Sequence, residues 1–289
     1  MTPETLPEGW TSARIRDVAA TWVWVPPGAS EARAPEYHLV AYPPSSLIPT
    51  HVAWCRSSRA AAAVVDEVLG IVRAWGRPDV SFWVGDRTKP ADLADHLTAR
   101  GAVHVESVEV LSLDLTAPAM AAAGLDTVVR DAATGRLECA GLEVRQVLDR
   151  ATLDDAAVVG NEVWGHEQRT EEDVDRQLAD LTGPEPTELR VVAYVDGEPA
   201  SAAGCTLAGD VARLWGGATR PAMRCRGAYR ATLGARLSLA RQRGASVGLV
   251  KAVTTTSAPI VRRLGFTGHG VEHRLRLDLT GTGTGTGTA

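Results

Sequence analysis

The sequence predicts an α+β fold made of two domains of similar architecture. Two segments of the 289-residue chain match each other without a gap at an offset of 164 residues. The second half mixes strand and helix patterns in the order strand, two helices, hairpin, strand, helix, strand, short helix, strand. An Asp-Gly pair at 196–197 separates two apolar runs, and this is the strongest short-range signal for an antiparallel hairpin.

Composition limits the class of protein. Apolar residues make up 45% of the chain, enough for a proper core, and the net charge of -5 disfavours a general nucleic-acid binder. No apolar stretch reaches the roughly 18 residues that cross a membrane, and the first ten residues do not resemble a secretion signal. Four scattered cysteines without a C-x-x-C pair favour reduced thiols. We therefore expect a cytoplasmic protein without a metal site, a nucleic-acid partner or membrane association.

The internal repeat pairs Leu97–Leu115 with Val261–Leu279. Gly101 falls on Gly265, and both segments close on the pattern Leu-x-Leu-Asp-Leu. Two ordinary helix-turn-strand units could match by coincidence, but the shared spacing favours duplication.

The duplication divides the chain into four parts. Residues 1–116 form the first domain and residues 142–280 the second. Residues 117–141 are interpreted as a linker, because they are small and show little periodicity. Residues 281–289 repeat Thr-Gly, and we expect a disordered tail there.

Local patterns place the elements of the second domain in order. Alternating apolar residues predict strands, and Thr152 and Thr170 are candidate N-caps, the latter in a capping box with Asp173. Gly-Gly at 216–217 suggests a bulge or a close approach of the backbone. The expected strands are 141–147, a hairpin over 188–207, 210–219, 246–253 and 271–279, and the expected helices are 152–165, 170–181, 227–243 and 257–264.

The most unusual segment is the loop "TRPAMRCRGAYRA" (219–231), which has four arginines and no acidic residue. A helix N-terminus has unpaired N–H groups and a partial positive charge, so sequences normally place Asp or Glu there. Their absence leaves this end open to an external anion such as phosphate. Gly227 would let the anion approach the backbone, and Arg224 and Arg226 could add charged contacts. The alternative is an ordinary helix start in an arginine-rich sequence.

This loop resembles the acetyl-CoA motif of the GCN5-related N-acetyltransferase (GNAT) family. In that motif an Arg or Gln, two residues, a Gly, one residue and a Gly or Ala hold the pyrophosphate. Arg224, Gly227 and Tyr229 occupy those places, and Tyr229 departs from the pattern. The segment "SAPIVRRLGF" (257–266) is similar to the closing helix and turn of the family. The similarity covers roughly Leu142 to Leu279, and the whole chain resembles the tandem-domain, actinobacterial type.

The resemblance implies two GNAT-like domains, each a mixed, mostly antiparallel sheet flanked by helices. It also implies a transferase, an acetyl-CoA-dependent N-acetyltransferase, in which an amine attacks the thioester directly. Acetyl-CoA would be the co-substrate, and the acceptor a small-molecule or N-terminal amine; a homodimer is left open. The cofactor-binding residues it implies are Gly217, Ala218, Thr219, Arg224, Cys225, Arg226, Gly227, Ala228, Tyr229 and Arg230.

The catalytic groups are less well marked. Val261 stands where the family often has a tyrosine that acts as the general acid. Thr254–Ser257 stands where the family has a segment with an asparagine. Glu162 and His166 are the candidate bases, although a solvated helix face for Glu162 and a polar turn for His166 are the favoured explanations. The alternative function is therefore a non-catalytic, regulatory acyl-CoA-binding protein with a GNAT fold.

The first domain is interpreted as a degenerate copy. At the offset of 164 residues, Arg224–Gly227 falls on Ala60–Ala63, so the arginine and the glycine are lost. We expect Ser57 or Ser58 to cap the corresponding helix, which would leave no site for phosphate.

Overall fold

The structure is a computed structural model, and it describes residues 6–21, 23–26, 28–43, 48–126, 128–130, 136–165 and 170–280. The tail expected at 281–289 lies outside the described residues. The chain divides into two compact units. The large unit contains Leu111–Lys251, Pro259–Gly268 and the residues up to Thr11. The small unit contains Ser12–Val110, Ala252–Ala258 and the residues from His269 onward.

The large unit is built on a sheet with the order β5-β12-β11-β10-β9-β8-β7-β6. The pairs from β11 to β6 are antiparallel, whereas β11 and β12 pair in parallel. This mixed, mostly antiparallel sheet confirms the predicted fold class. Its strands are β5 (Val103–Asp114), β6 (Val128–Arg130), β7 (Leu137–Cys139), β8 (Leu142–Gln146), β9 (Glu188–Val195), β10 (Glu198–Ala208), β11 (Val211–Thr219) and β12 (Val247–Val253).

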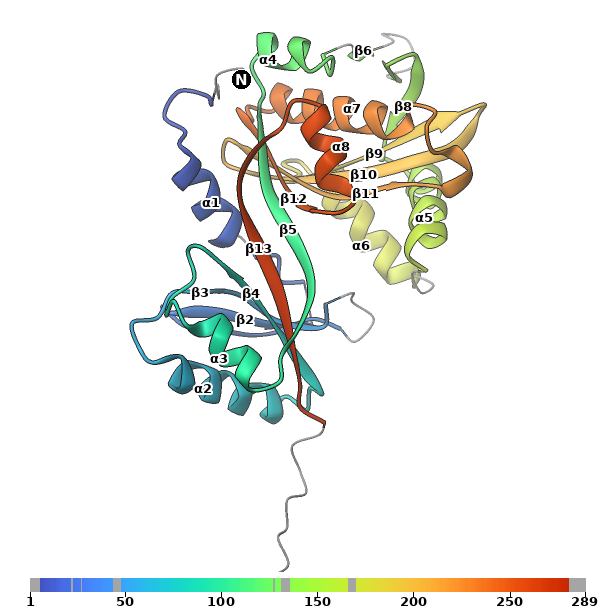
Figure 1. Cartoon of the computed structure of the whole chain (residues 1–289). Helices are drawn as coiled ribbons and strands as arrows, with labels where there is room; N and C mark the ends of the chain where they lie inside the picture. The colour runs from blue at the N-terminus through green and yellow to red at the C-terminus, as the bar shows by residue number, and fades with distance from the viewer. Residues whose placement is uncertain are drawn as a thin grey trace, which may run out of the picture. The chain divides into compact units, whose positions relative to one another are not determined.

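Helices cover both faces of this sheet. In Figure 1, α7 (Ala228–Gln242) lies on one face of β9, β10 and β11, and α5 (Arg150–Trp164) and α6 (Glu171–Thr182) lie on the other. Apolar side chains of α5 and α6 pack with residues of β9, β10 and β11 in one buried cluster. Within the described ranges, no helix combines the length and the apolar character that a membrane crossing requires.

Local sequence signals explain the ends of these elements. Asp196 and Gly197 both have positive φ angles, 53° and 82°, so the predicted hairpin between β9 and β10 closes with a tight turn. The predicted capping box of Thr170 and Asp173 begins α6. The N-cap of α5, however, is Asp149 and not Thr152. The Asp149 carboxylate accepts the backbone N–H of Thr152 at 2.8 Å, and Thr152 occupies the third helical position.

The segment 117–141, expected as a linker, is structured in its described part. It forms α4 (Ala117–Ala122), β6 and β7. Met120 and Leu125 are buried, and a Cβ atom placed on Gly234 of α7 would lie 3.2 Å from the Leu125 carbonyl oxygen. The segment therefore packs against α7. Strands of only three residues carry too little periodicity to be seen in the sequence.

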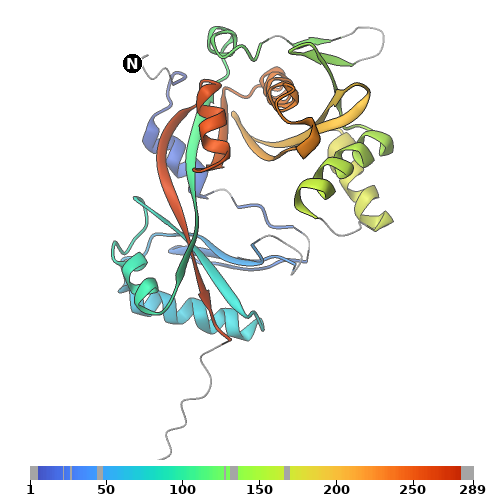
Figure 2. The same cartoon turned by 45° about the vertical axis from the view of Figure 1, so that its right-hand side comes forward.

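The strands of the small unit are paired in the order β1-β2-β3-β4-β13-β5. In Figures 1 and 2, α2 and α3 lie on one face of β2, β3 and β4, and α1 lies on the other. Its further elements are α1 (Ser12–Thr21), β1 (Ser30–Arg33), β2 (Tyr37–Ala41), β3 (Thr50–Cys55), α2 (Ala61–Ala74), β4 (Asp79–Gly85), α3 (Leu93–Ala99) and β13 (Thr267–Asp278).

The last strand departs from the boundaries drawn on the sequence. Those boundaries assign residues 142–280 to one domain, but β13 pairs with β4, and Leu275 and Leu277 are buried with Phe82 in the small unit's core. Alternating leucines give β13 an apolar face, and that face completes this core. The small unit is therefore discontinuous along the chain.

The structure also refines the repeat. The helices α3 and α8 (Ser257–Arg263) correspond residue for residue at the offset of 164, as do β5 and β13. Upstream, α2 begins at Ala61 and α7 at Ala228, an offset of 167. The residue that matches Gly227 at the helix start is therefore Ala60, and the sequence alignment of Arg224–Gly227 with Ala60–Ala63 is three residues out of register.

Replacing Leu125 with alanine tests the packing of the segment 117–141. Leu125 is fully buried, so Leu125→Ala should lower the free energy of unfolding by about 2–5 kcal/mol. The control Ala121→Ser changes an exposed residue of α4 and should alter it by less than about 0.5 kcal/mol. Urea denaturation measures both. Equal, small effects would show that this segment is a linker after all.

Candidate functional site

The end of β11 separates from β12. Their parallel pairing joins Val211–Leu214 to Val247–Val250, while β10 pairs with β11 as far as Thr219. Among the described residues of β12, none continues the pairing along Trp215–Thr219. This end of β11 therefore presents backbone that β12 does not cover.

A bulge shapes the same end of β11. The register with β10 shifts between Ala202 and Gly204, so that Gly216 and Gly217 form the extra length of β11. Gly216 has a φ angle of 60°, and both glycines are exposed. The bulge confirms the expectation from the Gly-Gly pair, and bulges of this kind redirect a strand's backbone groups.

The arginine-rich loop leads from β11 into α7 and leaves the helix start open. Gly227 is the N-cap with a φ angle of 83°, and Cys225 has a φ angle of 62°. No side chain caps the helix, and its first turn has no acidic residue. The first helical bond runs from the Ala231 N–H to the Gly227 carbonyl at 3.0 Å. In the described chain, no acceptor binds the N–H groups from Cys225 to Arg230, so this end suits an anion.

Three of the four arginines of this loop, Arg224, Arg226 and Arg230, have different partners. Arg224 is exposed, and its Nε lies 3.4 Å from the Thr219 carbonyl. Arg226 is paired with Asp196 at 2.6 Å. Arg230 donates to the Gly124 carbonyl at 3.0 Å, just beyond the C-terminus of α4. The Arg230 side chain is therefore directed away from the start of α7, and only the backbone N–H of Arg230 is available there.

Tyr229 connects the helix start to the bulge. Its side chain is half-buried, and a Cβ atom on Gly217 would lie 3.1 Å from the ring. Only glycine fits at 217 without displacing the ring. Tyr229 thus brings the first turn of α7 against the bulge of β11.

The candidate bases are only partly placed. Glu162, on α5, pairs with Arg220 at 2.6 Å, and Arg220 directly follows β11. Glu162 therefore lies beside the end of β11, with its carboxylate engaged in this ion pair. His166 lies outside the described residues. The apolar side chain of Val261 is buried, so this position supplies no general acid.

A group of buried and half-buried hydroxyls supports the end of β11, and the sequence did not predict it. Ser201 is fully buried and donates to the Ala218 carbonyl at 2.6 Å. Thr219 donates to Ser201 at 3.1 Å, and Thr232 of α7 lies 3.3 Å from the same Ser201 oxygen. The available signal was a serine within the apolar run "PASAAGC" of β10.

The small unit contains a similar separation of strands, and it is closed. The strands β3 and β4 pair only at His51 and Val52. The Lys89 N–H donates to the Cys55 carbonyl at 3.0 Å, and the Ser57 N–H donates to the Lys89 carbonyl at 3.1 Å. The segment after β4 thus pairs with the end of β3, whereas the described residues of β12 do not pair with the end of β11.

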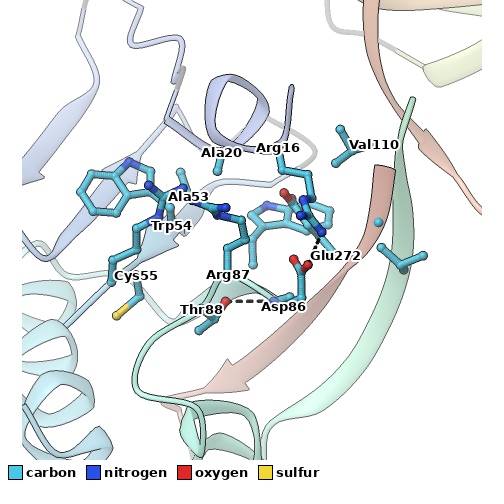
Figure 3. A pocket seen from close by; sticks show the side chains of 15 residues that line it. Arg16, Ala20, Ala53, Trp54, Cys55, Asp86, Arg87, Thr88, Val110 and Glu272 are labelled. Carbon is cyan, nitrogen blue, oxygen red and sulfur yellow. Dashed lines mark hydrogen bonds and ion pairs between the residues drawn. The ribbon is translucent and has the colours of Figure 1, made fainter. Parts of the chain in front are cut away.

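A small pocket remains beside this closure. Figure 3 shows Trp54 of β3 and Arg87 and Asp86 from the segment after β4 around it, with Arg16 of α1 directed toward Asp86. The cavity measures about 30 Å³, which is room for little more than water. Its arginines are paired with Asp17 and Asp86.

The start of α2 differs from the expectation. Its N-cap is Ala60 and no side chain caps it, so neither Ser57 nor Ser58 does so. Ser57 instead accepts the Arg59 N–H at 3.0 Å, within the tight turn before the helix. The Arg59 guanidinium is bound by Glu36 and Glu67. This helix start is therefore lined by the chain's own carboxylates.

Comparison with solved structures identifies the fold. The chain is similar to a GCN5-related N-acetyltransferase from Kribbella flavida over 87% of this chain and 90% of that one, with a TM-score of 0.56 and 19% identity. A tandem GNAT protein from the clavulanic acid biosynthesis pathway matches 89% of this chain over 85% of its own, with a TM-score of 0.57 and 15% identity. A functionally unknown conserved protein from Staphylococcus epidermidis matches 87% of this chain over 94% of its own (TM-score 0.59, 11% identity).

No protein-family model matches the chain, and no curated protein matches it. The structural similarity spans most of the chain and includes a tandem protein, so it confirms the tandem GNAT fold that the resemblance implied. At these identities the likeness establishes the fold alone.

Thiol labelling tests the geometry of the loop. Cys225 is exposed, whereas burial raises the pKa of Cys55, Cys139 and Cys205 to about 11. Thiolate is the reactive form, so a disulfide reagent at pH 8 should label one thiol of four quickly in the native protein and all four after denaturation. Cys225→Ser should remove the fast phase. A fast phase that persists in this variant would place the accessible thiol elsewhere.

Proposed function

We propose that the chain is an acetyl-CoA-dependent N-acetyltransferase and that the large unit holds the coenzyme. One observation carries this proposal: the open N-terminus of α7 lies beside the open end of β11. Two solved structures of similar fold, from Kribbella flavida and Sphaerobacter thermophilus, are named GCN5-related N-acetyltransferases. The tandem GNAT structure from the clavulanic acid biosynthesis pathway is described as one without AcCoA.

The diphosphate of acetyl-CoA would bind the N–H groups of 225–230. The helix dipole and the N–H groups favour a double negative charge there, and Gly227 lets it approach the backbone closely. Arg224 is exposed beside this end and would add a charge-assisted bond. Arg226 would reach the diphosphate after exchanging its partner Asp196, since that pair is exposed and weak.

The pantetheine arm and the thioester would follow the end of β11. This backbone, at Gly217, Ala218 and Thr219, is the part that β12 leaves uncovered. A backbone N–H on this strand would stabilise the oxyanion that forms when the amine attacks the carbonyl carbon. The carbon–sulfur bond then breaks, CoA leaves as a thiolate, and the new amide nitrogen loses its proton.

The acceptor amine must be neutral before it attacks. An alkyl ammonium has a pKa near 10.4 and is mostly charged at neutral pH, so a base or a water relay is needed. Glu162 and His166 stay the candidates, and Glu162 would act only when the acceptor displaces Arg220. We propose a small-molecule or N-terminal amine as the acceptor and, on the cysteine pattern, the cytoplasm as the compartment. An acyl-CoA-binding protein without turnover is the alternative, and the named relatives do not favour it.

Two substitutions at Gly227 test the anion site. Asp and Asn both tolerate the backbone geometry of this N-cap better than other side chains, but only Asp adds a negative charge. Acetyl-CoA at 100 times its dissociation constant should stabilise the wild-type protein by about 2.7 kcal/mol. Gly227→Asp should abolish this stabilisation, and Gly227→Asn should retain part of it. An unchanged response of Gly227→Asp would remove the site from this helix end.

Turnover is tested by incubating the protein with acetyl-CoA and a panel of amines and measuring free CoA. Release that depends on an amine and disappears in Gly227→Asp supports the transferase. Tight binding of acetyl-CoA with no release across a broad panel would favour the non-catalytic alternative.

A further inference from the structure

The large unit contains a fully buried arginine that the proposed chemistry does not use. Arg236 of α7 is 2% exposed, and its Nη1 donates to the Gly204 carbonyl at 2.9 Å and the Trp215 carbonyl at 3.2 Å. The Tyr229 hydroxyl hydrogen-bonds to the same guanidinium. Burial lowers the pKa of Arg236, and Tyr229 opposes this shift.

These partners lie at the bulge. Gly204 belongs to β10 and Trp215 to β11, and they are the first pair after the register shift. The bulge disrupts the ladder there, and buried carbonyl oxygens need donors. One guanidinium reaches a carbonyl of each strand, so it bridges the disrupted ladder from the side of α7.

Stability alone does not account for a charge at this position. Burying an ion costs several kcal/mol, and an apolar residue of similar volume is often as stable or more so. The Arg236 Nε is moreover buried with no acceptor among the described residues. The geometry that Arg236 imposes on its partners is therefore a better explanation of its presence than the energy it supplies.

That geometry concerns the proposed thioester strand. Trp215 immediately precedes Gly216 and Gly217, and a Cβ atom on Gly217 would lie 3.7 Å from the Arg236 Nη2. Through Tyr229 the same guanidinium reaches the first turn of α7, where the diphosphate is proposed to bind. A single side chain thus links the bulge, the open strand and the open helix end.

We propose that Arg236 is a positioning residue that holds the bulge of β11 in the conformation that binds the acyl-pantetheine arm of acetyl-CoA. It does not touch the coenzyme, and it acts through the Trp215 carbonyl and Tyr229. This proposal rests on the proposed function. It separates the site into two parts: a helix end that binds diphosphate without Arg236, and a strand that binds the acyl-pantetheine arm only with it.

The test compares two ligands in Arg236→Lys, Arg236→Met and the control Leu237→Met, which alters a buried apolar neighbour on the same helix. ADP carries the diphosphate and lacks the pantetheine arm. Both Arg236 variants should bind acetyl-CoA about tenfold or more weakly, because small misplacements in a site have large effects. Their affinity for ADP should stay within about twofold of wild type, and Leu237→Met should bind both ligands like wild type. Titration calorimetry measures the affinities.

Hydrogen exchange gives a second readout that needs no ligand. Exchange in the segment 214–219 should be at least about tenfold faster in the Arg236 variants than in wild type, with exchange in α7 unchanged. Equal loss of both ligands, or unchanged acetyl-CoA affinity together with unchanged exchange, would overturn the proposal. Failure of the wild-type protein to bind either ligand would instead contradict the proposed function.

Tyr229→Phe decides the question if the Arg236 variants do not fold. It removes one hydroxyl from the partners of Arg236 and leaves the ring over Gly217. Acetyl-CoA affinity should fall about threefold, with ADP affinity unchanged, since a hydrogen bond to a charged group is worth about 1.5–3 kcal/mol and the Gly204 and Trp215 carbonyls, which still bind the guanidinium, limit how much of its loss reaches the strand. Acetyl-CoA affinity equal to that of wild type would overturn the proposal.

Discussion

One electrostatic constraint underlies the proposed site: the N-terminus of α7 has no carboxylate of its own. Gly227 provides no side chain to cap the helix, and the N–H groups from 225 to 230 have no acceptor within the described chain. A helix start in this state is destabilised in isolation and stabilised by an anion. The corresponding helix of the small unit is also uncapped, but Arg59 there is bound by Glu36 and Glu67.

The strand beside the uncapped start of α7 narrows the range of ligands that this site would bind. An anion site alone would suit many phosphates, whereas the uncovered end of β11 adds a backbone edge for an extended arm. The bulge at Gly216 and Gly217 sets the direction of this edge, and buried polar side chains bind its carbonyl groups. Ser201 binds the Ala218 carbonyl and Arg236 binds the Trp215 carbonyl. In the small unit the corresponding edge is closed by the residues around Lys89.

The sequence predicted those features that depend on local chemistry. The turn at Asp196-Gly197, the capping box at Thr170, the bulge at Gly216-Gly217 and the open helix start are all set by backbone preferences of a few residues. Features set by distant contacts were missed. Arg236 is one arginine among many along the chain until the fold brings it to Gly204 and Trp215. The segment 117–141 looks like a linker until its buried residues meet α7. The predicted offset of 164 residues is correct for α3 and α8 and for β5 and β13. It is wrong by three residues for α2 and α7, because loop lengths between these elements differ.

The most direct test of the central claim is a crystal structure of the protein with acetyl-CoA. The account predicts diphosphate oxygens within hydrogen-bonding distance of the backbone N–H groups at the start of α7, and the pantetheine arm along Gly217–Thr219. Acetyl-CoA bound elsewhere, with this helix end empty or filled by a carboxylate of the chain, would contradict it.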